Sequence, residues 1–426
     1  MAIISVQETI FYIQSKIMKK EIIAGLSTFF TVAYLLILYP KILSAGGIDF
    51  GAALTATIVT IVLSTLFLAL YAKFPAVLAP GLSVGPYLVY SVILKHHIQW
   101  EAVLGLVFWT GCVLFILSLL KVRQHILRAL PPSIKSAAIA GIGLFLITAG
   151  LKNLDLFSAS FEYLPICIAF VGLLLFFTLY HFRIPGAFLL TILACWIGAI
   201  PFDLISFHGI AALPPSIKAT FLQLDLRTPL HPELLGTLLS VILINLFDTS
   251  ASLTALAKLA HQLDKRGWIN NIDKIVIPDG LGSMGAALLG TGTLTFTLES
   301  ASGIKAGGRT GMTAFIASLC CLVGLFFYPL ISTIPLFATT PILIAIGFFM
   351  VQEVRSIPWR NWTESIPALL MLGTIPITFS IYNGFSVGFI SYALLKIASL
   401  RAKEVHPISW TLALIFLIQF ALYFKT

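Results

Sequence analysis

Charged residues are scarce in this chain of 426 amino acids. Asp, Glu, Lys and Arg together make up 10% of the sequence, whereas hydrophobic residues make up 59%. A soluble globular domain carries far more charge on its surface, so that class of protein is excluded. The formal net charge is +9, but the basic residues are dispersed among loop positions, and this pattern argues against a nucleic-acid-binding surface.

Cysteine is also rare, and no pair of cysteines has CxxC spacing. All five lie inside apolar runs, where cysteine behaves as a small buried hydrophobic residue, so no thiolate metal site is predicted. They are Cys112, Cys167, Cys195, Cys320 and Cys321.

The motifs of enzymes and nucleotide-binding proteins are missing as well. The Gly-rich stretch AGGRTG, residues 306–311, is not GxxxxGK[ST], so it predicts a cytoplasmic turn anchored by Arg309 rather than a phosphate cradle. The eight histidines have no convincing metal spacing, and no Ser-His-Asp or Cys-His order supplies a nucleophile with its base. We therefore expect neither an enzyme nor a metal or organic cofactor.

Long apolar runs are what the sequence has in abundance. Most are about 15 to 22 residues long, which is enough or nearly enough to cross a bilayer as a helix. The runs are continuous rather than alternating, so helices are predicted and a barrel is not. The expected spans are 22–44, 52–72, 76–92, 100–120, 133–151, 161–180, 184–200, 232–259, 274–290, 293–306, 309–331, 338–352, 363–398 and 407–424.

The first twenty residues differ from these runs. Gln and Glu interrupt them, so they are no signal peptide. We expect residues 1–20 to form a cytoplasmic segment on the membrane surface, with Ile10, Phe11, Ile13 and Ile17 as its apolar stripe.

Charge and span number together predict the topology. The long span 363–398 is expected to cross once, with a break near Pro376 and Asn383, which gives about fourteen crossings. Most Lys and Arg residues then lie on the side of the N-terminus, so the positive-inside rule places both termini in the cytoplasm. The basic residues that contradict this arrangement are Lys396, Arg401 and Lys403.

The longest extramembrane stretch, 201–231, is an expected extracytoplasmic linker that divides the chain into two halves. With an odd number of spans in each half, the second half must insert upside down relative to the first. Inverted repeats of this kind are the plan of many secondary transporters.

Two interrupted spans occupy matching positions in these halves. The third contains LAPGLSVGPYLVY (78–90) and the tenth contains GTGTLTFTLESASG (290–303). Paired broken segments of this kind indicate a binding site near the bilayer midplane. The alternation in TLTFT is typical of extended backbone, whose free N–H and C=O groups suit a flat heterocycle. Tyr87 and Phe296 are candidates for stacking on its face, with ordinary core packing as the alternative.

Three acidic residues lie well inside the expected spans, namely Asp248, Asp279 and Glu299. A charge near the bilayer centre costs roughly 2.5–3.5 kcal/mol, which a fold tolerates when the group faces a cavity, forms a pair or binds a proton. We interpret Glu299, beside the break, as a cargo contact and Asp248 as a second one. For all three acids the alternative is a capping or buried structural acid. Asp279 in particular follows Pro278 near an expected helix start, where an acid stabilises exposed N–H groups.

Several of these motifs resemble the AzgA-like purine permeases, a branch of the nucleobase–cation symporter superfamily that also contains the uracil and xanthine permeases. The resemblance extends from about residue 20 to the end, and it is most specific in LESASGIKAGGRTG (298–311) and FISYALLK (389–396). The other segments that carry it lie within 28–43, 47–57, 69–81, 245–253, 290–314, 337–350 and 357–396.

The resemblance implies an all-α polytopic membrane fold of about fourteen spans in two inverted seven-span repeats, 21–200 and 232–426, with short strands in broken spans three and ten. It implies a core domain made of spans 1–4 (about 21–120) and 8–11 (about 232–331). It also implies a gate domain made of spans 5–7 (about 133–200) and 12–14 (about 338–424). The base is then expected between the strands, near Glu299 and Asp248, with Asp279 as a further acid.

The chain departs from the family pattern around this expected site. In span three, SVGP (83–86) replaces the usual Gly-Leu-Asn-Ala, so Gly85 lacks the side chain of an Asn associated with holding the base, and Pro86 lacks an N–H. In span one, Tyr39 stands where Asn is common. Phe296 and Thr297 replace the more usual Thr and Tyr. The expected substrate contacts are Glu299, Asp248, Gly85, Ser83, Phe296, Thr297, Thr295 and Tyr87.

We therefore expect a proton symporter of the inner membrane that imports a nucleobase, above all a purine such as adenine, guanine or hypoxanthine, by an elevator-like movement of core against gate. Glu299, Asp248 and Asp279 are the candidate proton carriers, and the proton is the only coupling partner expected. The expected partners are the base, the lipid bilayer and a second copy in a homodimer, but not nucleic acid.

Three alternatives stay open. One is transport of uracil, xanthine or a related heterocycle on the same fold. The second is anion exchange, with half-helix N-termini holding the anion, although Glu299 would repel it. The third is an enzyme or receptor that only binds the base.

Overall fold

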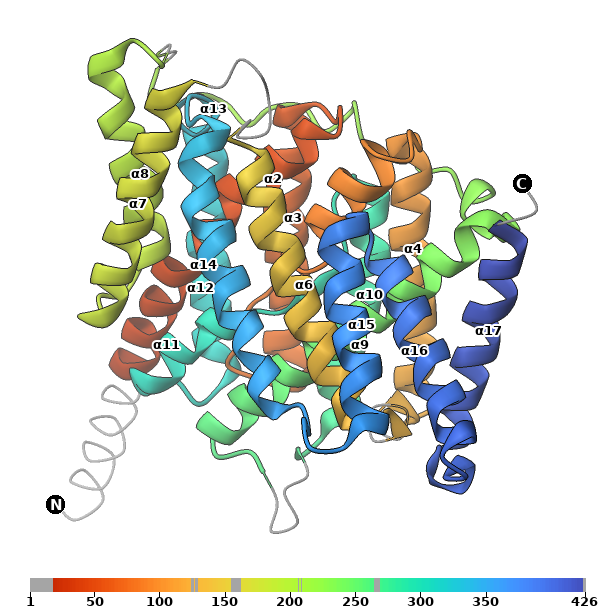
Figure 1. The fold of residues 1–426 in the computed structure, drawn as a ribbon. Coiled ribbons are helices and arrows are strands. Elements are labelled where there is room, and N and C mark those ends of the chain that lie inside the picture. The colour runs from red at the N-terminus through yellow and green to blue at the C-terminus, as the bar shows by residue number, and fades with distance from the viewer. Residues whose placement is uncertain are drawn as a thin grey trace, which may run out of the picture.

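The computed structural model describes residues 18–123, 126, 129–154, 162–205, 207, 209–263 and 269–423. Helices stand side by side in a bundle (Figure 1). Within the described residues, nine helical segments are long and apolar enough to cross a membrane. The expected surface helix in residues 1–17 lies outside the described part of the chain.

The first helical segment runs from Met18 to Ala45 and is interrupted by a turn at Ala33 and Tyr34. The other principal elements are α2 (Leu35–Ala45), α3 (Phe50–Phe67), β1 (Leu78–Pro80), α4 (Trp100–Leu119), α6 (Pro132–Lys152), α7 (Tyr163–His181), α8 (Ala187–Ala199), α9 (Pro232–Leu259), α10 (Ile272–Leu289), β2 (Leu294–Phe296), α11 (Ala301–Lys305), α12 (Gly311–Val323), α13 (Tyr328–Ser332), α14 (Thr340–Val351), α15 (Trp362–Thr378), α16 (Ile381–Ala398) and α17 (Pro407–Tyr423).

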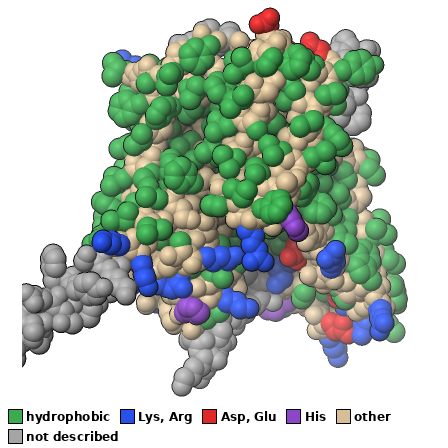
Figure 2. All heavy atoms as spheres, turned by 90° about the vertical axis from the view of Figure 1, so that its left-hand side faces the viewer, with side chains coloured by type: hydrophobic (Ala, Val, Ile, Leu, Met, Phe, Trp, Pro, Cys, Tyr) green, Lys and Arg blue, Asp and Glu red, His purple; other side chains and the backbone are tan. Residues whose placement is uncertain are grey.

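The outer surface of the bundle is apolar along its flank. Figure 2 shows hydrophobic side chains covering this flank, with Lys and Arg gathered along the lower edge. On α7, large apolar side chains such as Phe170 and Leu174 are more than half exposed, at 60% and 55%. Lipid accommodates such a surface, and water does not. The fold is therefore the helical membrane protein that the sequence predicts.

The two interrupted spans meet in a short antiparallel sheet. Leu78 pairs with Phe296, Ala79 with Thr295, and Pro80 with Leu294. Both strands are short because Pro80 cannot donate to the ladder and a helix begins soon after each strand. The expected short strands in spans three and ten are thus confirmed.

The helices pack in two groups, and the sheet contacts α2, α3, α9 and α10. α10 packs along α4 and α3, and α12 packs along α3. In the other group, α14 packs along α6 and α7, while α15 packs along α6 and α16. α9 contacts members of both groups, including α4, α6 and α16.

The expectation of one broken span over 363–398 is wrong. α15 and α16 are separate helices that pack against each other in antiparallel directions. Their close contact is seen at two glycines of α16: a Cβ added at Gly384 would lie 2.1 Å from Ile375, and one added at Gly388 would lie 2.2 Å from Met371. The turn between them contains Phe379, which is left-handed at φ 49°, and Ser380, whose hydroxyl oxygen accepts from the N–H of Asn383. Pro376 lies inside α15 without dividing it.

This correction changes the position of the chain's last helix. α17 begins beside the loop before α6, where the Ser409 hydroxyl donates to the carbonyl of Ala129 at 3.2 Å. It ends near the start of α9, where the Gln419 amide oxygen lies 2.7 Å from a Cβ built on Gly236. In Figure 1, the start of the first helical segment and the end of α17 lie at opposite ends of the bundle. The termini themselves, for which one common side was expected, lie outside the described residues.

We call the end of the bundle where α4 and α16 finish and α6 and α10 begin the basic end. It carries Lys121, Arg123 and Lys396. Because α15 and α16 each cross the bundle, Lys396, Arg401 and Lys403 also lie at this end. The residues that contradicted the charge bias in the one-span interpretation now agree with it.

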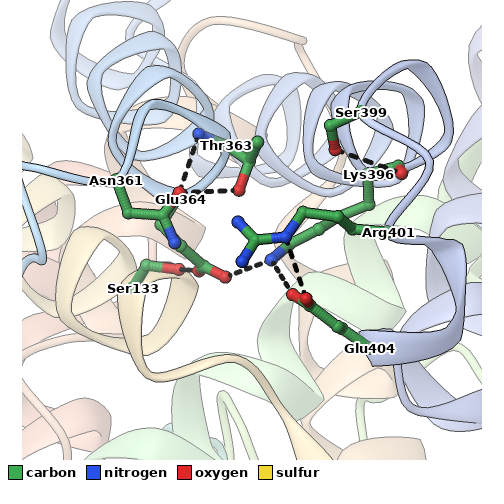
Figure 3. A network of polar contacts seen from close by, with 8 residues as sticks. All are labelled: Ser133, Asn361, Thr363, Glu364, Lys396, Ser399, Arg401 and Glu404. Atoms are coloured by element: carbon green, nitrogen blue, oxygen red, sulfur yellow. Dashed lines mark hydrogen bonds and ion pairs between the residues drawn. The ribbon is translucent and has the colours of Figure 1, made fainter.

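A polar network ties α16 to α15 and α6 at the basic end (Figure 3). The Lys396 ammonium is 2% exposed and lies 2.8 Å from Glu364 and 3.0 Å from Glu404. Ser133 donates a hydrogen bond to Glu364, and Arg401 pairs with Glu404 at 2.9 Å. A cation enclosed in this way needs such partners, because an unpaired buried charge is strongly destabilising.

The Gly-rich turn 306–311 is anchored, but Arg309 is only part of the anchor. The buried Glu21 carboxylate accepts hydrogen bonds from the backbone N–H groups of Arg309 and Thr310, at 3.1 and 3.2 Å, and from the Thr313 hydroxyl. A carboxylate suits the start of α12, where free N–H groups concentrate positive charge. The predicted turn is confirmed, with Glu21 as a member that the motif did not reveal.

Candidate functional site

Side chains of α9 and α10 hold strand β2 in place. The Asn245 amide donates to the carbonyl of Leu294 at 2.8 Å, and the N–H of Leu294 donates to the Ser283 hydroxyl at 2.9 Å. The backbone groups of Leu294 are therefore taken by the protein. This leaves less free backbone for a cargo than the alternating sequence predicts.

Glu299 lies just after β2, at the start of the helical turn that leads into α11. The Tyr34 hydroxyl donates to its Oε1 at 2.6 Å, and the Thr31 hydroxyl donates to its backbone carbonyl at 3.0 Å. Both partners come from the first helix, at the point where that helix is interrupted. Glu299 keeps part of its surface accessible, whereas Tyr34 is buried at 1% exposure.

Asp248 lies on α9 and reaches the turn after β1. The Ser83 hydroxyl donates to its Oδ2 at 2.6 Å. A Cβ built on Gly81 would lie 3.4 Å from that oxygen and 3.2 Å from the Thr295 hydroxyl oxygen. The Asp248 carboxylate therefore meets one hydroxyl residue from each broken span, and any side chain at position 81 would crowd them.

The two acids belong to one electrostatic neighbourhood. The carboxylates of Asp248 and Glu299 interact by coulombic repulsion, and Asp279 adds to it. Asp248 is partly accessible, as Glu299 is, while Ser83 and Thr295 are buried at 4%. The structure thus brings together Glu299, Asp248, Ser83 and Thr295 of the predicted contacts.

Asp279 is engaged differently. It lies inside α10, which Asn271 precedes, so it does not cap the helix, and its burial corresponds to the alternative of a buried structural acid. Its Oδ2 lies 2.6 Å from the Arg123 guanidinium and accepts from the Thr249 hydroxyl at 3.3 Å. Both members of this ion pair are buried, so Asp279 joins α10 to the end of α4. Sequence analysis did not identify Arg123 as its partner.

The predicted aromatic contacts pack against the protein. Phe296 is 1% exposed and meets Phe74 edge-on at 6.0 Å between ring centroids. Tyr87 is likewise buried and meets Phe145 edge-on at 6.1 Å. These contacts correspond to the core-packing alternative.

Thr297 fixes the strand pair rather than facing open space. Its hydroxyl lies 3.1 Å from the carbonyl of Val77 and 2.8 Å from the Ser300 hydroxyl oxygen. The Ser300 hydroxyl oxygen in turn accepts from the N–H of Val77 at 3.0 Å.

Gly85 leaves no free space for a side chain. A Cβ built there would lie 2.5 Å from Cε2 of Tyr39, closer than such atoms approach in proteins. Tyr39 is completely buried in α2. Tyr39 and Gly85, which both depart from the family pattern, are therefore in contact, since the Tyr39 ring occupies the space beside Gly85.

Tyr34 is the site residue that sequence analysis missed. The Tyr34 side chain contacts Glu299 although the sequence offers no charge or motif at position 34. The sequence offered only a weak signal for Tyr34. Pro40 lies a few residues further along the same helical segment, and the structure shows that this segment is interrupted at Tyr34.

Comparison with known proteins gives the family. Residues 19–387 match the permease family designated Xan_ur_permease. The chain is 39% identical over 417 residues to a Methanocaldococcus jannaschii protein named as a permease, with 95% of each chain covered. It is 32% identical over 424 residues to the guanine/hypoxanthine permease PbuO of Bacillus subtilis, covering 95% of this chain and 98% of that one. It is 30% identical over 413 residues to the adenine permease AdeQ of Escherichia coli, covering 95% and 93%.

Solved structures share the fold. The transmembrane domain of the cyanobacterium bicarbonate transporter BicA superposes with a TM-score of 0.63 at 17% identity, covering 89% of this chain and 97% of that one. The murine anion transporter Slc26a9 in its inward-facing state gives a TM-score of 0.66 at 12% identity, covering 89% and 68%. At these identities the likeness concerns the fold alone. The family match and the relatives together establish that this multi-pass membrane protein belongs to the permease family that includes adenine and guanine/hypoxanthine permeases.

Proposed function

We propose that the chain is a secondary active transporter that imports a nucleobase, preferably a purine, by proton symport. The observation that carries this proposal is the convergence of Asp248 and Glu299 on the paired strands of the two broken spans. The relatives named as adenine and guanine/hypoxanthine permeases support the substrate class.

The carboxylates suit such a cargo chemically. A purine presents ring N–H groups, and an ionised carboxylate accepts hydrogen bonds from them. Tyr34 donates to one oxygen of Glu299, and Ser83 donates to one oxygen of Asp248. Both carboxylates therefore keep further lone pairs that can accept hydrogen bonds from a ligand.

Proton coupling follows from the same pair. Two repelling carboxylates in a water-poor site favour uptake of one proton by the pair, and that proton removes a charge that would be costly to move through the bilayer. Asp279 is a weaker candidate for this proton, because the Arg123 guanidinium already neutralises its charge.

The proposed movement is an elevator-like displacement of a core against a gate. We assign to the core the helices of the α3–α4–α10–α12 group, with the two broken spans, and to the gate the group of α6, α7, α14, α15 and α16. We further propose inverted repeats, an inner-membrane location, and a cytoplasmic basic end. The first helix then starts in the cytoplasm and α17 ends outside it.

Anion exchange is the second candidate, because BicA is named as a bicarbonate transporter and Slc26a9 as an anion transporter. The two carboxylates argue against it. An anion between the half-helices would lie beside Glu299 and Asp248 and be repelled by both.

An uptake experiment tests the proposal. The chain is expressed in a bacterial strain that lacks its own nucleobase permeases and is given labelled adenine, guanine, hypoxanthine, xanthine or uracil, with and without a protonophore. We expect concentrative uptake of at least one purine that the protonophore abolishes. Uptake of labelled sulfate or bicarbonate without uptake of any base would support the anion exchanger instead. Label that only equilibrates across the membrane would contradict symport.

A further inference from the structure

The Tyr39 hydroxyl lies where the two broken spans approach each other. A Cβ built on Gly292, just before β2, would lie 1.7 Å from this hydroxyl oxygen, and one built on Gly85, just after β1 and its turn, would lie 2.8 Å from it. Only residues without side chains allow the phenol this position. Ser83, the hydrogen-bond partner of Asp248, is two positions from Gly85.

This hydroxyl has no protein partner within the described residues. The neighbouring Thr293 hydroxyl, next to Gly292, is also buried and without a partner there. Leaving a buried hydroxyl unsatisfied is unfavourable, and proteins usually pair such groups with the chain, with water or with a ligand.

Other buried hydroxyls share this property, including those of Thr60, Tyr90 and Thr110. Those residues lie on α3, in the helical segment Tyr87–Ile93 and on α4, respectively. Tyr39 and Thr293 are distinguished by their place at the crossing of the two broken spans. A polar ligand at the strands is therefore the partner that fits the Tyr39 hydroxyl.

The acids at the broken spans determine which kind of partner is needed. Ionised Asp248 and Glu299 are acceptors, so they suit the N–H groups of a base. A purine also has unprotonated ring nitrogens, which require a donor. The Tyr39 O–H is such a donor, and its ring is held between two glycines.

We propose that the Tyr39 hydroxyl donates a hydrogen bond to an unprotonated ring nitrogen of the transported purine and so acts as a specificity-determining residue. This inference rests on the proposed function. It assigns to span one a substrate contact, and it explains why Gly85 and Tyr39 depart from the family pattern together.

The test uses the purified full chain in lipid nanodiscs. Binding of adenine and hypoxanthine is measured for wild type and for Tyr39→Phe, which keeps the ring and removes only the hydroxyl. The same is done for the 3-deaza and 7-deaza analogues of each base and for 1-deazaadenine, in each of which a C–H replaces one ring nitrogen. Tyr90→Phe is the matched control, because it removes another buried hydroxyl that has no hydrogen-bond partner in the described part of the chain and that lies in the helical segment Tyr87–Ile93.

We expect Tyr39→Phe to bind the parent base about five- to tenfold more weakly, the effect of one lost hydrogen bond. One deaza analogue should bind wild type with a similar loss and should show no further loss on Tyr39→Phe, as expected when both changes remove one interaction. Tyr90→Phe should bind every compound as wild type does.

Thermal unfolding without ligand separates a substrate contact from a structural one. Tyr39→Phe should keep the wild-type Tm without base and show a smaller Tm increase when base is added. Equal affinity of wild type and Tyr39→Phe for all compounds would overturn the inference, as would a clear loss of Tm without base. If wild type binds none of the bases, the proposed function itself fails.

Discussion

Tyr34 donates a 2.6 Å hydrogen bond to Glu299, which lies 265 positions further along the chain. This contact joins the interruption of the first helix to the broken tenth span. The Tyr34 hydroxyl orients Oε1 of Glu299, while Oε2 takes no part in this hydrogen bond. In the proposed transporter, a carboxylate held in this way needs little further ordering when the base binds.

Glu299→Gln should nearly abolish uptake of the preferred base while leaving membrane abundance unchanged. Gln has almost the same shape, but it is neither an ionised acceptor nor a proton carrier, and a hydrogen bond to a charged group contributes about 1.5–3 kcal/mol. Initial uptake rates and immunoblots of membranes measure the two effects. Glu353→Gln, in the turn Gln352–Ser356, is the matched control. Normal uptake by the Glu299 variant would contradict the assignment.

Tyr34→Phe should weaken uptake less than Glu299→Gln does. It removes the oriented donor but keeps the carboxylate, so we expect a rise in KM of roughly tenfold at most. Its uptake should also need a different external pH for half-maximal rate, because the carboxylate loses a partner of its ionised form. A KM and pH profile identical to those of wild type would show that the Tyr34 contact does not prepare the site.

Asp248→Asn and Asp279→Asn should fail in different ways. Asp248→Asn is expected to stay folded and lose the dependence of uptake on the proton gradient. Asp279→Asn leaves the buried Arg123 guanidinium unpaired, and breaking a buried pair costs about 3–5 kcal/mol. Detergent-solubilised Tm values and uptake across external pH distinguish the two outcomes.

A compensating variant checks the explanation for Asp279. Replacing both members, Arg123→Met with Asp279→Leu, should recover much of the lost Tm, because no buried charge remains. If Asp279→Asn keeps its Tm and loses the gradient dependence of uptake instead, the coupling roles of the two acids are reversed.

Gly85→Asn should block binding. The new Cβ would lie 2.5 Å from the ring of Tyr39, which is completely buried, and overpacking of this kind typically costs 1–3 kcal/mol. Gly85→Asn combined with Tyr39→Asn should restore the space and regain binding. A competition panel of purines on the single and double variants is the measurement. Binding by Gly85→Asn at wild-type affinity would show that the Tyr39 ring moves freely.

Acid should weaken the network at the basic end. The hydrogen bond from Lys396 is the main cause that lowers the pKa of Glu404, and Arg401 lowers it further (Figure 3). Because the folded-state pKa lies below the unfolded value of about 4.3, the stabilisation is present above that pH and is lost as pH falls through the folded pKa. The Tm difference between wild type and Glu404→Gln should therefore shrink in acid. A constant difference from neutral pH to pH 3 would contradict this role.

The sequence by itself determined the membrane fold, the family resemblance and the importance of the two broken spans. These inferences depend on quantities that act locally. Apolar run length decides whether a helix can cross lipid, and Gly, Pro and Thr content decides where a span is interrupted. The cost of a charge in lipid is equally independent of partners, and this cost singled out Asp248, Asp279 and Glu299.

The tertiary structure alone decided the partners of these groups. Tyr34 and Glu299, Arg123 and Asp279, and Tyr39 and Gly85 are far apart in sequence, and no periodicity indicates that they meet. The division of 363–398 into two helices was hidden for a related reason. Pro376 looked like the break, but a proline is tolerated inside a membrane helix when neighbouring groups satisfy the freed carbonyl. The chain instead reverses direction at the left-handed Phe379, and Gly384 then packs against α15.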